Sequence, residues 1–145
     1  GIRNAAPLVG RELAIAYAGS VSEIGSAFAT LEERSIAGLL VGADAFFSSQ
    51  RIPIVALAAR HRWPAIYQWR EFVEDGGLMS YGANLVDSWR LLASRTGRIL
   101  QGVKPADLPV VQSSRFELVI NAQTARMLNL TVPQSLLAAA DEVIE

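Results

Sequence analysis

The sequence predicts an α/β protein whose parallel sheet is flanked by helices. Short apolar runs alternate with amphipathic segments over residues 13–70, which is the rhythm of repeated strand and helix units. The run at residues 36–41 is nearly all apolar, as expected of a strand that helices cover on both faces. With 51% apolar and 19% charged residues among 145, the chain is able to bury a core of its own.

Three strand and helix units are expected in the first half of the chain. A strand is predicted at residues 13–18, and a helix follows because Ser20 and Glu23 have the spacing of a capping box. The apolar run at residues 36–41 is the second strand, and a second helix is predicted at about residues 50–62. Residues 65–67 form the third short strand.

The second half changes rhythm after Gly76 and Gly77. A short strand is expected at residues 78–81, and Asn84 is the predicted N-cap of a long helix that ends near Gly102. Trp89 lies on the apolar stripe of that helix and is interpreted as a core residue. The remaining elements are an extended connector at residues 104–109, a half-exposed strand at 115–120, a helix from Asn121 to Leu128 and a last helix that Pro133 begins.

Composition and motifs exclude several classes of function. The net charge is −1 with no cationic stripe, so a nucleic-acid partner is not expected. The chain has no cysteine, and its apolar runs are far shorter than the ~20 residues of a membrane span. Neither a nucleophile elbow nor a glycine-rich phosphate loop occurs, and the single histidine, His61, is interpreted as structural. No catalytic residue, metal ligand or cofactor is therefore predicted.

Two loops carry residues suited to binding a small molecule. In an open parallel sheet, ligands bind outside the carboxyl ends of the strands, and these ends carry Asp44, Phe46 and Phe47 in one loop and Arg70 and Glu71 in the next. Aromatic rings would hold an apolar body and the charged groups would meet its polar ends. The alternative is that the two phenylalanines are core residues and the charged pair merely begins a helix.

Motifs along the whole chain resemble a bacterial family of ABC-transporter substrate-binding proteins. They include the sequences at residues 57–67, 70–82 and 97–102, and they continue in order to the end of the chain. Further matching words lie at residues 104–110, 116–121, 128–133 and 140–145. The resemblance implies the periplasmic-binding-protein-like fold of class I, in which two Rossmann-like lobes joined by three crossovers close on a ligand.

By this resemblance the chain is the C-terminal half of such a protein. Residues 1–77 are expected to form most of the C-terminal lobe, residues 78–113 a return segment that belongs to the N-terminal lobe, and residues 114–145 the third hinge crossing and C-terminal helices. The missing N-terminal lobe would supply the rest of the ligand site. Family members are exported, so a signal peptide is expected upstream and the location is periplasmic or otherwise extracytoplasmic.

The resemblance also implies a function without chemistry. The chain is expected to be the solute-binding component of an ABC importer that captures an amino acid, an aromatic one included, or a related carboxylate, and hands it to a membrane permease. Glu71 is placed to receive an α-ammonium group, and Tyr81 is a further candidate contact. The alternatives are a sensory ligand-binding domain of the same fold and an α/β enzyme. Exposed apolar side chains would favour association with the missing lobe or with a second copy.

Overall fold

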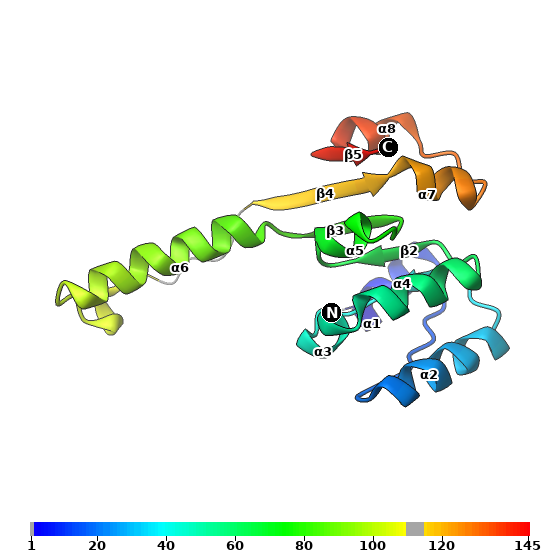
Figure 1. Ribbon diagram of the computed structural model, residues 1–145, viewed down its shortest axis with the longest axis horizontal. Coiled ribbons are helices and arrows are strands. Elements are labelled where there is room, and N and C mark those ends of the chain that lie inside the picture. Colours follow the sequence, from blue (N-terminus) through cyan, green and yellow to red (C-terminus); the bar gives the residue numbers. More distant parts are fainter. Residues whose placement is uncertain (1, 110–114) are drawn as a thin grey trace.

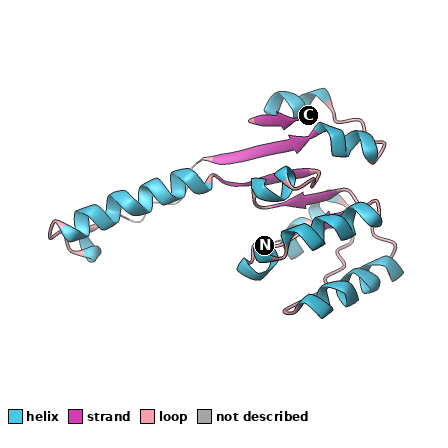
Figure 2. Ribbon diagram, viewed as in Figure 1, coloured by secondary structure: helices cyan, strands magenta, loops and turns pink. Residues whose placement is uncertain are grey.

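The structure is a computed structural model that describes residues 2–109 and 115–145. A five-stranded sheet lies at its centre. Its strands are β1 (Leu39–Leu40), β2 (Ala65–Tyr67), β3 (Met79–Ala83), β4 (Phe116–Asn121) and β5 (Glu142–Ile144), in the spatial order β1-β2-β3-β4-β5. All neighbours pair in parallel except β3 and β4, which are antiparallel. The predicted α/β class is confirmed, with a mostly parallel sheet (Figure 2).

Helices surround this sheet, and one of them leaves it. Figure 1 shows α6 extending away from the remaining elements at the point where β3 ends and β4 begins. The described helices are α1 (Ile2–Ala5), α2 (Val21–Glu33), α3 (Ala45–Ser49), α4 (Arg51–Arg60), α5 (Arg70–Glu74), α6 (Leu85–Leu100), α7 (Ala122–Met127) and α8 (Gln134–Ala139), with 3-10 turns η1 (Pro7–Val9) and η2 (Pro105–Asp107).

The main hydrophobic core lies between the sheet and helices α2 and α4. Each of these helices turns its apolar side to the sheet, and the aromatic rings of Phe28 and Trp63 stack with centroids 5.5 Å apart. His61 stacks on Trp63 in the same cluster and pairs with Glu32 at 3.2 Å, so it occupies a structural position. The buried members are Ile24, Phe28, Leu31, Ile54, Val55, Ala58, Trp63, Ala65, Tyr67 and Phe72.

Side-chain caps begin three of the helices where the sequence predicts them. Ser20 accepts a hydrogen bond from the backbone N–H of Glu23, Asn84 from that of Asp87, and Asn121 from that of Thr124. Each cap satisfies a backbone donor that the first turn of a helix leaves without a partner. These local signals explain why the predicted starts of α2, α6 and α7 agree with the structure.

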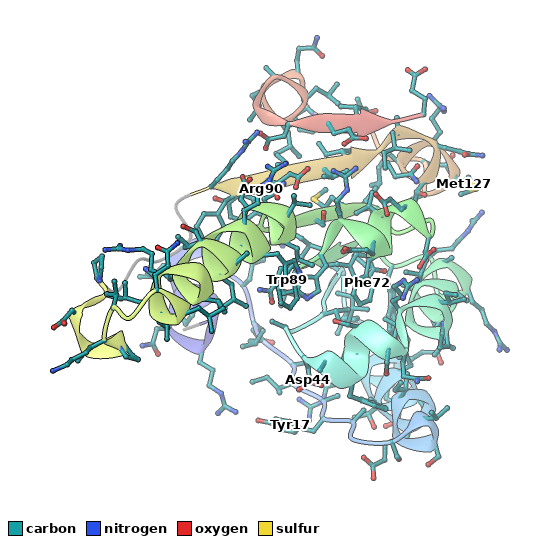
Figure 3. The ribbon with its side chains drawn as sticks, turned by 60° about the vertical axis from the view of Figure 1, so that its left-hand side comes forward. Tyr17, Asp44, Phe72, Trp89, Arg90 and Met127 are labelled. Atoms are coloured by element: carbon teal, nitrogen blue, oxygen red, sulfur yellow. The ribbon has the colours of Figure 1, made fainter. Side chains whose placement is uncertain are left out.

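The strand predicted at residues 13–18 is wrong. This segment makes no backbone hydrogen bond to β1 among the described residues, and it is not a strand. Its alternation is nonetheless real, because Ala14, Ala16 and Ala18 pack partly buried against the core while Tyr17 is 76% exposed and points outward in Figure 3. Alternating residues show that a chain is extended, but a strand also needs a neighbour with which to pair.

Several short elements were not predicted, among them α1, η1, α3 and β5. The loop that carries Asp44 continues directly into helix α3, and the segment after Ala140 adds the parallel strand β5 to the edge of β4. Both elements have five residues or fewer, which is too short for a hydrophobic period to stand out. The strand predicted at residues 36–41 shortens to β1, and the connector at residues 104–109 contains the turn η2.

Trp89 is not a core residue, contrary to the interpretation of its helical stripe. Its side chain is 64% exposed, and none of the residues of α6 is buried. In Figure 3 the side chain of Trp89 extends from α6 on the side where Asp44 lies. The stripe is correct as a pattern, but within the described residues no element covers it.

None of the described helices is both long and apolar enough to cross a membrane.

Asn121 provides a test of how β4 and α7 are joined. Its side chain caps α7 through Thr124 and also donates to the carbonyl oxygen of Val73 at 3.3 Å in a buried position. We expect Asn121→Ala to lower the free energy of unfolding by about 2 kcal/mol, because a cap and a buried hydrogen bond are lost together. Denaturant unfolding measures the loss, and the exposed Gln123→Ala in the same helix is the control, expected within about 0.5 kcal/mol of the parent.

Candidate ligand-binding site

A pocket of about 220 Å³ lies at the carboxyl edge of the parallel strands. The residues that follow β2 form one wall of this pocket. The last residues of β3 and the first turn of α6 form another, and Glu117 of β4 also lines the pocket. Its lining consists of Gln68, Trp69, Arg70, Glu71, Ser80, Gly82, Ala83, Asn84, Leu85, Val86 and Glu117. The carboxyl edge of an open parallel sheet is where α/β proteins bind their ligands.

Glu71 lines this pocket, and one of its oxygens has no hydrogen-bond partner in the part of the chain that the structure describes. Helix α5 begins immediately after β2, which places Glu71 in the first turn of the helix at the pocket wall. Its Oε2 atom is buried, and no described donor lies within hydrogen-bond distance of it. A buried carboxylate oxygen without a hydrogen bond costs free energy, so a donor at this position would stabilise Glu71.

Arg70, the neighbour of Glu71, is occupied by three carboxylates of the protein. Its guanidinium donates to Glu74, Glu117 and Glu142, each at 2.8 Å. The hydrogen bond to Glu74, together with the hydrogen bond and charge of Glu142 and the charge of Glu117, raises the pKa of Arg70. The guanidinium therefore ties α5 to β4 and β5 through one N–H group of each of its three nitrogens.

Glu117 extends this network to the start of α6. One of its oxygens accepts from Arg70, and the other accepts from the side-chain amide of Asn84 at 2.9 Å. The same Asn84 accepts from the backbone N–H of Asp87 at 3.0 Å as the N-cap of α6. A continuous chain of hydrogen bonds thus runs from α5 through β4 to the first turn of the projecting helix, and it fixes the direction in which α6 leaves the sheet.

The other predicted site residues lie outside the pocket lining. Asp44 accepts from the backbone N–H of Phe46 at 2.7 Å and caps α3, at the same edge of the sheet but in the neighbouring loop. Phe46 and Phe47 pack partly buried against the main core. Tyr81 is 55% exposed and stacks on Phe116 with ring centroids 5.6 Å apart. The structure therefore brings Arg70 and Glu71 together and leaves these four residues apart from them.

Sequence reasoning did not single out several residues of this pocket. Gln68 and Trp69 belong to the loop that the carboxyl-end rule predicts after β2, but neither was selected as a ligand contact. Asn84 was recognised as a helix cap alone, and Glu117 was one polar residue of an alternating strand. Only the antiparallel pairing of Glu117 with Gly82 brings it to the carboxyl edge of β3.

A second pocket, of about 230 Å³, lies at the opposite edge of the sheet. Trp63, Ala65 and Leu78 line it at the amino ends of β2 and β3, and helices α4 and α7 flank it. No unpartnered buried side-chain atom lies in its described lining. Within the described residues there is also no cluster of three side chains able to hold a metal ion. The first pocket is thus the better candidate for a ligand site.

Glu117 offers a test of the network that orients α6. Its side chain is 15% exposed, whereas Glu74, the partner of Arg70 on the surface, is 47% exposed. We expect Glu117→Gln to lower the free energy of unfolding by about 1–3 kcal/mol, because two hydrogen bonds to a charged group are disturbed. Thermal or denaturant unfolding measures the change. Glu74→Gln is the matched control and should cost less than about 1 kcal/mol; equal losses would contradict the special position of Glu117.

A substitution at Gly82 tests how closely β3 packs against the loop that follows β2. A Cβ atom at this position would collide with the backbone carbonyl oxygen of Gln68, which is not free to move aside. We expect Gly82→Ala to cost about 1–3 kcal/mol by overpacking and to displace the pocket wall. Gly97→Ala is the control, since a Cβ there meets no atom within 4 Å, and it should stabilise helix α6 by roughly 0.5–1 kcal/mol. Unfolding curves of both variants distinguish the two outcomes.

Three solved structures of longer proteins share this fold. A conserved domain protein from Vibrio cholerae superposes with a TM-score of 0.89 at 25% identity over 98% of this chain. An ABC domain from Streptococcus pneumonia in complex with L-Trp superposes with a TM-score of 0.85 at 28% identity over 95% of this chain. A ligand-free, open substrate-binding protein from Clostridium difficile shares the fold at 20% identity, with a TM-score of 0.67 over 99% of this chain.

The chain spans 48% of the length of each of these three proteins. No functionally curated protein matches the sequence. A family model does match it, from residue 2 to residue 144, and its description is ABC transporter substrate binding protein. A match over nearly the whole chain, together with the periplasmic-binding fold of its structural neighbours, establishes that this chain belongs to the ABC transporter substrate-binding protein family.

Proposed function

We propose that the chain is the C-terminal half of the solute-binding component of an ABC importer, and that it captures an amino acid or a related small organic ligand. The observation that carries this proposal is the pocket at the carboxyl edge of the sheet, which Glu71 lines with a buried oxygen that no described residue hydrogen-bonds. Membership of the substrate-binding family supports the role. The L-Trp complex of the relative from Streptococcus pneumonia supports an amino acid as the ligand.

The second wall of the ligand site would come from an N-terminal lobe. The pocket lies where α6 leaves the sheet, and the exposed stripe of α6 carries Val86, Trp89 and Leu92. A stripe of this kind is expected to pack against another apolar surface, since its exposure to water is unfavourable. The return segment predicted at residues 78–113 would then enter the N-terminal lobe after β3, and β3 and β4 would be the crossings about which the lobes close.

Capture would take place outside the cytoplasm, where a membrane permease receives the loaded protein. Closure of the two lobes would gain its free energy from contacts that form only when the ligand bridges both walls. The half-site of this chain alone is therefore expected to bind more weakly than the protein with both lobes. No chemical step is proposed, because the function needs binding and release alone.

Tryptophan fluorescence gives a direct test of ligand capture at this pocket. Trp69 lines the pocket, whereas Trp89 lies exposed on α6. We expect a panel of amino acids and small aromatic acids, titrated into the two-lobed protein, to contain at least one compound that changes the emission saturably. Trp69→Phe should remove most of this change and Trp89→Phe should retain it, with affinities confirmed by calorimetry. A panel in which no compound binds would contradict the proposal.

A further inference from the structure

The second pocket, hereafter the amino-edge pocket, does not belong to the proposed ligand site. It lies at the opposite ends of β2 and β3 and shares no lining residue with the pocket of Glu71. Its volume is about 230 Å³. An engineered protein cavity of roughly 150 Å³ holds a benzene molecule, so the amino-edge pocket is large enough for one ring with a short polar arm.

The interior of the amino-edge pocket is apolar and aromatic. Trp63 is 9% exposed and Tyr67 is 2% exposed, and stacking holds their rings in place, on His61 and on Phe72 respectively. The transfer of an apolar ring from water into such surroundings is favourable. Aliphatic side chains and a thioether complete the wall, namely those of Val55, Ala58, Leu78, Met127 and Leu128.

The hydroxyl group of Tyr67 adds a polar atom to this interior. It takes part in none of the side-chain hydrogen bonds of the described residues. It is also not one of the unpartnered atoms that the described fold seals from solvent, so it has access to the pocket that Tyr67 lines. Burial raises the pKa of Tyr67, so the hydroxyl stays protonated and able to donate to a ligand oxygen.

Arg62 is the one charged residue in the described lining of the pocket. Its guanidinium forms no ion pair with a carboxylate of the described residues. The ends of the flanking helices α4 and α7 carry a partial negative charge, but each has an arginine of its own in the last turn, Arg60 and Arg126. Arg62 is therefore an additional cation, and no carboxylate in the described lining would repel an anion.

The backbone of Arg62 gives an independent reason to look for a role of its side chain. Arg62 follows the C-cap of α4 with a left-handed φ of 56°, a conformation that favours glycine because a Cβ atom crowds the turn. Helix α7 ends in the same way with Asn129, a residue type that tolerates this conformation. The turn after α4 would be more stable with glycine, so Arg62 brings its cation to the pocket at a cost in stability.

We propose that the amino-edge pocket is a second binding site, which takes a small carboxylate with one apolar ring. The ring lies among the apolar side chains, and Arg62 pairs with the carboxylate, whose two oxygens match the donors of a guanidinium. The Tyr67 hydroxyl is a further donor to the ligand. This site goes beyond the proposed function and does not depend on it. Helix α6 leaves the sheet after β3, away from this pocket, so the second lobe is not needed to complete the site (Figure 1).

The experiment compares acids with their uncharged amides. The two-lobed protein is titrated by calorimetry with benzoate and phenylacetate, and with benzamide and phenylacetamide, which have nearly the same shape. At least one acid should bind with a dissociation constant of about 1 mM or lower, as a ligand of this size permits. Its amide should bind at least roughly tenfold more weakly, because the charged partner of Arg62 is lost.

The variants Arg62→Gly and Arg60→Gln assign the charge effect to one arginine. Arg62→Gly removes the guanidinium and suits the left-handed turn, so it should weaken the acid by roughly tenfold or more without lowering the midpoint of thermal unfolding. Arg60 is exposed at the end of the same helix and does not line the pocket. Arg60→Gln should therefore change the affinity by less than about threefold.

The variants Ala59→Leu and Ala56→Leu locate the bound ring. Both alanines are exposed on α4, but only Ala59 lines the amino-edge pocket. Leucine is nearly as favourable as alanine in a helix, so both variants should fold. Ala59→Leu should weaken the acid by roughly tenfold or more because its side chain occupies the space of the ligand, and Ala56→Leu should change the affinity by less than about twofold.

The outcomes keep this inference apart from the proposed function. Trp69→Phe alters the carboxyl-edge pocket alone and should leave the affinity for the acid unchanged. The second site is overturned if neither acid binds, if the amide binds as well as the acid, or if either pair of variants behaves alike. It is also overturned if Trp69→Phe abolishes binding of the acid. In each of these cases the capture of an amino acid at the other edge is untouched.

Discussion

The ion-pair network centred on Arg70 joins the parts of the sheet that the chain order keeps separate. Arg70 lies on α5, directly after β2, while its partners Glu117 and Glu142 come from β4 and β5. These two strands reach the sheet only after the chain has left it through α6 and returned. The antiparallel pairing of β3 with β4 supplies the backbone hydrogen bonds of this return, and Arg70 adds side-chain contacts across the same junction. The pocket lies where these elements meet.

The network also decides which charges at the pocket are paired within the protein. A guanidinium at the end of a strand is by itself a good partner for a carboxylate, because its donors match the two oxygens. Here three of these donors are directed at carboxylates of the protein, and the same arrangement satisfies both oxygens of Glu117. Glu71 remains outside the network with a buried oxygen.

Helix α6 is the longest of the described helices, and none of its residues is buried. Asn84 and Glu117 hold its first turn against the sheet, but its exposed apolar stripe, with Trp89 at its centre, finds no cover among the described residues. A rigid start and an unpartnered stripe suit a helix that links two bodies. Through the Asn84 hydrogen bond, the orientation of such a helix is coupled to the same carboxylate that lines the pocket.

Much of the fold could be predicted because its signals are local. Helical periodicity placed α2 and α4, and the capping residues Ser20, Asn84 and Asn121 marked where α2, α6 and α7 begin. Residues 13–18 show the limit of such signals: their alternation correctly indicates an extended chain, but whether a strand forms depends on a neighbour elsewhere in the sequence. The short strand β5 has too few residues to produce a period at all.

By itself, the sequence determined the α/β class, the loops at the carboxyl ends of the strands, and the presence there of Arg70 beside Glu71. Only the tertiary structure decided that these adjacent residues have different partners. Arg70 meets partners 47 and 72 positions away in the chain, and the buried oxygen of Glu71 meets none among the described residues. The residue types in the sequence show which groups are charged. Which charges neutralise one another depends on contacts between distant segments, and these exist only once the chain has folded.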